Sequence, residues 1–171
     1  FATNPEMDTL SDTELKKRME QVEPGHTDEI YAFYKKSFPK KTNAELLYMA
    51  TTDRAYFLDS TIQAARRSTV PGAGPTYMYN FNWETPVQGG RFFATHAVDI
   101  PFVFDSLAKA PTMVGPVTKD KQALADRVSA CWASFARTGV PSAPGMPKWT
   151  PYNAATRPTM RVLCMSGYTD D

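Results

Sequence analysis

The chain has 171 residues, and its 19 lysines and arginines nearly balance its 18 aspartates and glutamates, which leaves a formal net charge of +1. A length near 150 residues allows about 70% of the unfolded surface to be buried, so the chain is long enough for one domain of ordinary size. The even charge gives no support to a nucleic-acid groove, and no apolar run approaches the roughly 18 residues of a membrane span, so we expect a soluble protein, either cytoplasmic or secreted.

The first third of the chain predicts helices with clear start signals. Ser11 and Glu14 have the spacing of a capping box, in which each side chain bonds the backbone N–H of the other residue. We expect the helix that they begin to end near Val22, where a Pro-Gly pair follows. Thr27 is expected to cap a second helix.

A second capping box, formed by Thr42 and Glu45, predicts a long helix over about residues 44–67. Apolar side chains recur along it at roughly i, i+3 and i+4 spacing, which predicts one buried face. That inner face is expected to contain Leu46, Leu47, Ala50, Phe57, Leu58 and Ile62.

The second half mixes short strands with one strong helix. A Pro- and Gly-rich linker over residues 70–75 precedes an aromatic strand at 76–81, and residues 160–164 predict a last strand. Between the strands we expect a helix that is capped by Asp120 and ended by Gly139. Its buried stripe is expected to contain Leu124, Val128, Cys131, Trp132 and Phe135.

Strands are scarce along this chain. At most three are visible, too few for a doubly wound sheet, which would lack its centre and expose a long edge. The sequence begins at Phe1 without an initiator Met, and residues 1–4 read like the end of a strand entering a loop. We therefore expect this chain to be the later part of a longer protein that holds most of the strands.

Cysteine occurs only at Cys131 and Cys164. Two cysteines so far apart do not form a disulfide framework, and the sequence has no C-x-x-C pair for a zinc site. We expect both thiols to be reduced and buried, and the sequence implies no metal.

The strongest candidate for chemistry is His96. It follows the glycine pair Gly89–Gly90 and two aromatic residues, and an apolar run comes after it. The ordinary pKa of histidine, about 6.5, lets it accept and return a proton near neutral pH, and the glycines let the backbone turn sharply before it. This pattern fits a catalytic base on a loop that the apolar run anchors in a core. It also fits a structural histidine in the core, whose ring nitrogens bond the backbone.

Four motifs carry a resemblance to a known family. They are YMYNFNWETP at residues 77–86, the His96 segment ending in DIPFVF at 99–104, WASFARTGVP at 132–141 and PKWTPY at 147–152. The first two resemble the catalytic-histidine region of type-B carboxylesterases, the family of the cholinesterases and para-nitrobenzyl esterases. The last two are similar to the C-terminal pattern of that family. The likeness covers nearly all of residues 1–163.

This resemblance implies an α/β-hydrolase fold with a triad in the chain order Ser, Glu, His. His96 matches the general base. Glu6, on a loop after an earlier strand, matches the acid, which would fix the tautomer of the imidazole and stabilise the imidazolium. Residues 1–171 would then be the C-terminal portion of one α/β catalytic domain, incomplete without its N-terminal strands.

The nucleophile is expected from outside this sequence. The 171 residues contain no G-x-S-x-G motif and no glycine-rich oxyanion loop, both of which lie upstream in the family. The implied partners are thus an N-terminal part of the same enzyme, which carries the serine, and a small-molecule ester. On this interpretation the chain alone cannot hydrolyse an ester.

Other titratable groups compete with these two. Asp99 is close to His96, and we expect it to cap the turn that follows rather than to take part in catalysis. Glu84 is expected at a solvated rim, and His26 in an exposed loop before a helix.

Candidate pocket residues flank the two triad positions. Phe92 and Phe93 precede the base and could line an acyl or alcohol pocket or merely pack the loop, and Met7 and Leu10 follow the acid and could face the same cleft. No metal or organic cofactor is implied.

Two alternatives remain. The same fold also serves as a binding surface, so a non-catalytic adhesion relative is possible. The chain could also be a small independent binding domain in which His96 is structural.

Overall fold

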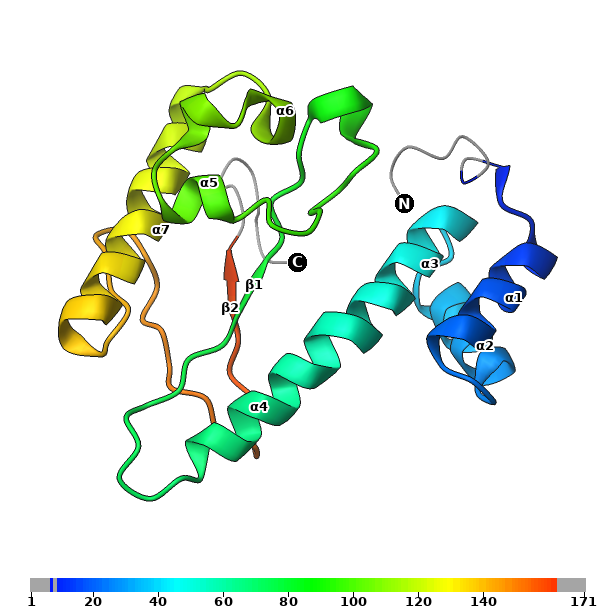
Figure 1. Cartoon of the computed structure of the whole chain (residues 1–171), viewed down its shortest axis with the longest axis horizontal. Coiled ribbons are helices and arrows are strands. Elements are labelled where there is room, and N and C mark those ends of the chain that lie inside the picture. Colours follow the sequence, from blue (N-terminus) through cyan, green and yellow to red (C-terminus); the bar gives the residue numbers. More distant parts are fainter. Residues whose placement is uncertain (1–6, 8, 163–171) are drawn as a thin grey trace. The chain divides into compact units, whose positions relative to one another are not determined.

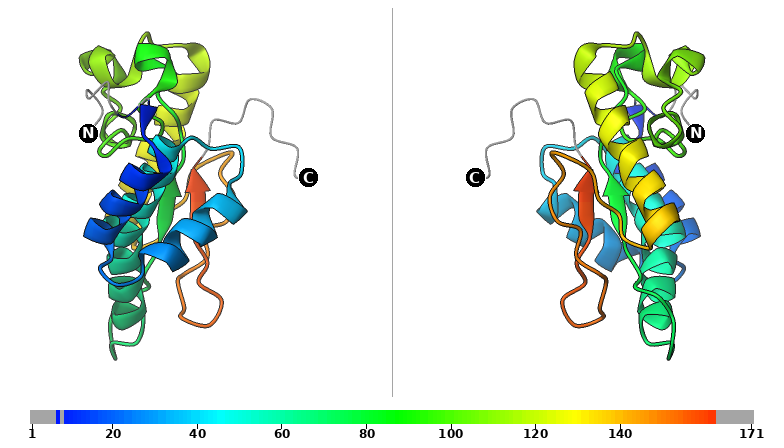
Figure 2. Two further views of the ribbon diagram at one scale, coloured as in Figure 1. Left: turned by 90° about the vertical axis from the view of Figure 1, so that its right-hand side faces the viewer. Right: turned by 90° about the vertical axis from the view of Figure 1, so that its left-hand side faces the viewer.

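The structure is a computed structural model that describes residue 7 and residues 9–162. The chain divides into two compact units, residues 1–63 and 64–171, and the boundary falls inside helix α4 (Leu58–Ser68). Figure 1 labels the main helices and strands of both units, and Figure 2 shows the chain from two further sides. Each unit has its own buried cluster of apolar side chains. We describe the units one after the other.

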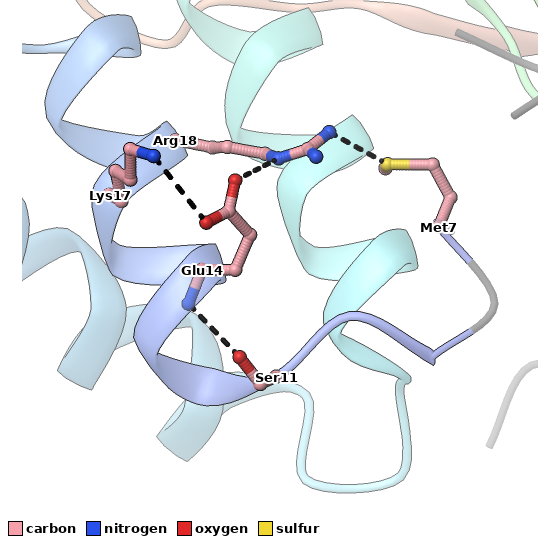
Figure 3. Close-up of polar contacts among 5 residues, drawn as sticks. All are labelled: Met7, Ser11, Glu14, Lys17 and Arg18. Atoms are coloured by element: carbon pink, nitrogen blue, oxygen red, sulfur yellow. Dashed lines mark hydrogen bonds and ion pairs between the residues drawn. The ribbon is translucent and has the colours of Figure 1, made fainter.

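The first unit is built from helices α1 (Asp12–Val22), α2 (Thr27–Ser37) and α3 (Asn43–Thr52). The predicted start of α1 is confirmed, since Ser11 Oγ accepts a bond of 3.2 Å from the backbone N–H of Glu14. The Glu14 carboxylate accepts a hydrogen bond from Arg18, one turn along the helix, in place of the predicted bond from the backbone N–H of Ser11. Arg18 also donates from Nη1 to Sδ of Met7 at 3.1 Å (Figure 3). The core of the unit consists of Met7, Leu15, Met19, Tyr34, Ala44, Leu46, Leu47 and Ala50.

The predicted cap of α2 is wrong. His26 occupies the N-cap position without a side-chain bond, and Thr27 is the first helical residue. The Thr27 hydroxyl donates instead to the carboxylate of Glu20 in α1, so it joins two helices rather than capping one.

The capping box at the start of α3 is confirmed in both directions. Thr42 Oγ1 accepts from the backbone N–H of Glu45 at 3.3 Å, and the Glu45 carboxylate accepts from the backbone N–H of Thr42 at 2.7 Å. This reciprocal pair satisfies two backbone donors that a helix start otherwise leaves unpaired.

The long helix predicted over 44–67 is interrupted. A π-helical turn, η2 (Asp53–Phe57), joins α3 to α4. Such a turn rotates the following residues around the helix axis relative to the preceding ones, so one apolar stripe cannot continue through it. The first three residues of the expected inner face are buried, as predicted, whereas Phe57, Leu58 and Ile62 are exposed.

The second unit contains a parallel pair of strands, β1 (Tyr79–Phe81) and β2 (Met160–Val162). Tyr79 pairs with Met160, and Phe81 with Val162. Strand β1 is shorter than predicted because it begins three residues late. Strand β2 begins at residue 160 as predicted, and the rest of the predicted last strand, with Cys164, lies outside the described residues.

Between these strands the chain forms short helical segments and one long helix. The segments are η3 (Val87–Gly90), α5 (Ile100–Val103), η4 (Leu107–Lys109) and α6 (Pro111–Val114), and the long helix is α7 (Lys119–Thr138). Figure 2 shows α7 running alongside the strand pair. The cluster that joins them contains Trp83, Val98, Phe102, Leu107, Val114, Leu124, Ala125, Val128 and Val162.

Helix α7 follows the prediction except at its first turn. Thr118, not Asp120, is the N-cap, and its hydroxyl accepts from the backbone N–H of Lys121 at 3.3 Å. Gly139 ends the helix with a left-handed φ of 75°, which glycine adopts without a Cβ clash. Cys131 is buried as predicted, and burial raises the pKa of its thiol.

The stripe of α7 is less buried at its end than predicted. Leu124, Val128 and Cys131 are buried, Trp132 is half-buried, and Phe135 is exposed. Phe135 packs edge-on against the ring of Tyr77, with ring centroids 5.9 Å apart. The last turn of α7 therefore packs against an aromatic ring at the surface rather than within the core.

A buried lysine fastens the start of α7 to the end of α6. Lys121 is 8% exposed, and its Nζ donates to the carbonyls of Val114 at 2.6 Å and Pro116 at 2.7 Å. The same ammonium lies 5.6 Å from the ring centroid of Trp83. Carbonyl oxygens and an aromatic face stabilise a cation that burial would otherwise penalise.

Candidate active site around His96

His96 lies in the second unit on the loop between β1 and α5, and its side chain is exposed. The backbone on both sides of it adopts left-handed conformations, with φ of 49° at Phe93 and 66° at Ala97. A side chain at positive φ costs on the order of 1 kcal/mol, and such strain persists only where the surroundings enforce it. The contacts at the two ends of the loop hold these residues in the left-handed conformation.

The entry side of the loop is fixed by Thr85, which is 1% exposed. Its backbone N–H donates to the carbonyl of Phe93 at 3.1 Å, so the loop closes on itself before His96. Its hydroxyl donates to the carbonyl of Met113 at 2.5 Å and accepts from the backbone N–H of Val87 at 3.2 Å. One buried threonine thus joins the loop to α6.

The exit side is anchored in the apolar core. Val98 is 2% exposed and Phe102 fully buried. The ring of Phe102 lies 5.1 Å from that of Phe81 and 4.8 Å from that of Trp83, centroid to centroid. The segment after His96 is therefore held by the strand region and by α7, as its apolar run predicts.

Asp99 does not cap the turn that follows, so that prediction is wrong. It stands at the N-cap position of α5 without a side-chain cap bond. Its Oδ2 instead accepts a bond of 2.8 Å from the hydroxyl of Tyr79 in β1. Burial, and then the bond to Asp99, raise the pKa of Tyr79, so this phenol stays a neutral donor even above its ordinary pKa of about 10. A bond between residues 20 positions apart has no local sequence signal.

The candidate pocket residues fall into both units. Phe92 and Phe93 are half-buried beside His96 in the second unit. In the first unit, Met7 is 2% exposed within the core, and Leu10 packs against that core. Glu6 lies outside the described residues.

The second unit also contains an aromatic cavity that the sequence did not predict. It has a volume of about 450 Å³, within the usual range of small-molecule pockets, and none of Phe92, Phe93 and His96 lines it. The aromatic strand at 76–81 and the tryptophans of the last two motifs are the sequence signals that could have located it. Its aromatic lining consists of Tyr77, Tyr79, Trp132, Phe135 and Trp149.

The other two rival titratable groups, Glu84 and His26, are exposed as predicted. The Nδ1 of His26 lies 3.3 Å from the carboxylate of Glu29. Among the described residues, no group of three or more His, Cys, Asp or Glu side chains could hold a metal ion. In the same part of the chain, no helix has the length and apolar character that crossing a membrane requires.

Comparison with known proteins decides the family. A sequence model of the carboxylesterase family matches residues 3–166. The chain belongs to the carboxylesterase family. The resemblance carried by the four motifs is thereby confirmed.

The curated relatives are much longer than this chain. A para-nitrobenzyl esterase of Bacillus subtilis is 28% identical over 124 residues, which are 72% of this chain and 24% of that protein. Carboxylesterase 4A of Bos taurus is 35% identical over 102 residues, 58% of this chain and 18% of that protein. The chain thus spans about a quarter or less of these relatives.

Solved carboxylesterase structures share the fold of this chain. The carboxylesterase Est55 of Geobacillus stearothermophilus superposes with a TM-score of 0.78 at 28% identity, over 99% of this chain and 35% of that one. A para-nitrobenzyl esterase structure superposes with a TM-score of 0.65 at 24% identity, over 90% of this chain and 30% of that one. The mostly helical chain with its short parallel sheet therefore corresponds to about a third of a carboxylesterase.

Proposed function

We propose that this chain supplies the base and the acid of a serine carboxylesterase: His96 is the general base and Glu6 the triad acid. The observation that carries the proposal is the His96 loop, an exposed imidazole between two left-handed residues. Both ends of the loop are fixed, by buried Thr85 on one side and buried Phe102 on the other. A base that must meet a nucleophile needs this combination of access and rigid support.

In this proposal residues 1–171 are the C-terminal portion of a single α/β-hydrolase catalytic domain. The parallel pairing of β1 with β2 supports it, because parallel strands occur in α/β sheets covered by helices. So does the share of about a third of each solved carboxylesterase that the chain covers. An N-terminal portion would provide the other strands and the nucleophilic serine. We call the protein with both portions the complete esterase.

The chemistry follows from the three roles. His96 takes the proton of the serine hydroxyl as its oxygen attacks the carbonyl carbon of an ester. The imidazolium, stabilised by the Glu6 carboxylate, then protonates the leaving alcohol, and an acyl-enzyme remains. Water attacks the acyl-enzyme with His96 again as base, which releases the acid and frees the serine.

The proposed substrates are small carboxylic esters, in keeping with the names of the relatives. Phe92 and Phe93, next to the base, are proposed to line the acyl or alcohol side of the pocket. Met7 and Leu10, next to the acid, are proposed to face the same cleft.

The test is hydrolysis of a short-chain aryl ester by variants of the complete esterase. We expect His96→Ala to lower kcat by about 10²-fold to 10⁴-fold, the usual contribution of a positioned base. Glu6→Gln is expected to lower it as well. The matched control is His26→Ala, because His26 is an exposed histidine of the same chain, and its loss should change kcat less than twofold.

A loss of less than tenfold in His96→Ala would show that His96 is not the base. If the complete protein also fails to react with a serine-directed phosphonate, a non-catalytic binding relative of the same fold becomes the better interpretation.

A further inference from the structure

The aromatic cavity of the second unit is walled by rings that meet at nearly right angles. The rings of Tyr79 and Trp132 lie 4.9 Å apart, centroid to centroid, with an angle of 85° between their planes. The ring of Tyr77 stands at 78° to that of Trp149 and at 82° to that of Phe135. Such edge-to-face contacts hold each ring in place against another. The cavity, of about 450 Å³, is therefore lined by rings whose orientation is already fixed, which favours a planar aromatic ligand.

The polar hydrogens of two of these rings are already used. The indole N–H of Trp149 donates to the backbone carbonyl of Met78 at 3.1 Å, and the hydroxyl of Tyr79 donates to Asp99 at 2.8 Å. Phe135 has no polar atom, so these three rings offer a ligand their carbon surface and no spare donor. The part of a ligand that enters the cavity must therefore be apolar, because a polar group buried there without a partner would lose its hydrogen bonds to water.

The wall of the cavity also carries a positive charge. Among the described residues that line the cavity, Arg67, in the last turn of α4, is the only charged one. It is exposed, and within the described part of the chain no carboxylate pairs with its guanidinium. A guanidinium is planar, and its fork of N–H donors fits the two oxygens of a carboxylate. Arg67 is thus available to an anionic group of a ligand whose ring lies in the cavity.

The same charge excludes the other class of ligand that clusters of rings bind. Quaternary ammonium groups are attracted to the negative faces of aromatic rings. No aspartate or glutamate is among the described residues that line this cavity, and Arg67 would repel such a cation. The charge on the wall therefore favours an aromatic anion over an organic cation.

We propose that the aromatic cavity binds a planar aromatic carboxylate, with its ring among the aromatic side chains and its carboxylate on the guanidinium of Arg67. The rings supply the buried contact area, and the ion pair directs the carboxylate end of the ligand toward α4. This inference does not depend on the triad assignment, because it concerns binding alone.

The test measures the binding of two probes to the complete esterase by isothermal titration calorimetry. Naphthoate has a planar ring system and a carboxylate, and naphthylmethanol has the same ring system without the charge. We expect naphthoate to bind about tenfold more tightly, because hydrogen bonds between charged groups are stronger than those of a neutral alcohol. Raising the ionic strength should weaken the binding of naphthoate and leave that of the alcohol unchanged. If neither probe binds, the inference is refuted.

Arg67→Met tests the position of the carboxylate, with Arg66→Met as matched control. Both arginines are exposed in the last turn of α4, but only Arg67 lines the cavity. Arg67→Met should weaken the binding of naphthoate about tenfold and leave that of naphthylmethanol unchanged. Arg66→Met should change neither affinity. Equal affinities of the two variants for naphthoate would overturn the assignment of an anionic ligand.

Phe135→Ala tests the position of the ring, with Phe104→Ala as control. The two phenylalanines are 46% and 73% exposed, so neither truncation should unfold the protein, and only Phe135 lines the cavity. Because an aromatic contact is lost, Phe135→Ala should weaken the binding of both probes about twofold to tenfold, and Phe104→Ala should weaken neither. Unchanged affinities in Phe135→Ala would show that the probes bind elsewhere and would refute the inference.

Discussion

Replacing Phe102 by alanine tests whether the segment after His96 is anchored as the structure indicates. Phe102 is fully buried, and its ring contacts those of Phe81 and Trp83 at centroid distances of 5.1 and 4.8 Å. Truncating a buried phenylalanine costs about 3–5 kcal/mol, and each aromatic pair adds about 0.5–1.5 kcal/mol beyond buried area. We therefore expect Phe102→Ala to lower the free energy of unfolding by about 4 kcal/mol.

The assay is equilibrium unfolding of the complete esterase in urea, followed by tryptophan fluorescence. With a urea dependence of about 3 kcal/mol per molar, a loss of about 4 kcal/mol moves the midpoint down by about 1.3 M. Phe104→Ala is the matched control: the same residue type two positions later, but 73% exposed. Its effect should stay within about 0.5 kcal/mol. Equal shifts in the two variants, or a loss below about 1 kcal/mol in Phe102→Ala, would refute the anchoring argument.

Two more predictions concern single hydrogen bonds. Thr42→Ala should cost about 1 kcal/mol of stability, because it breaks the reciprocal capping box of α3, whereas Thr52→Ala near the end of the same helix should cost almost nothing; equal urea midpoints would contradict this. The pKa of Tyr79 is raised in the folded state. Below pH of about 10 its phenol is neutral in both the folded and the unfolded protein, and above that pH the phenol ionises first in the unfolded protein. The free energy of unfolding should therefore fall as pH rises above about 10, and the advantage of wild type over Tyr79→Phe should shrink there; an advantage that stays constant from pH 8 to 11 would show that the phenol is not protected.

Where local patterns predicted a helix start or end correctly, its cause lies within a few residues. The capping box of Thr42 and Glu45 and the left-handed end at Gly139 need only neighbouring backbone groups. The burial of the α7 stripe as far as Cys131 follows from helical spacing. The His96 loop was found by the same reasoning, from glycines before it and an apolar run after it.

Two of the errors come from contacts that local patterns do not show. Thr27 bonds Glu20 in another helix, and Asp99 bonds Tyr79 in a strand, so each side chain leaves the local role that its position suggested. The π-helical turn at Asp53–Phe57 has no local signal, and the expected inner face is exposed from Phe57 on. The bond from Arg18 to Met7 joins residues 11 positions apart and was equally invisible.

The distance between the Glu6 carboxylate and the His96 ring in a crystal structure of the complete esterase tests the central claim most directly. If these residues are the acid and base of one triad, a carboxylate oxygen should lie within about 2.6–3.2 Å of Nδ1, with Nε2 facing a serine hydroxyl. A Glu6 side chain that points away from His96, with another carboxylate on the ring or none, would contradict the account.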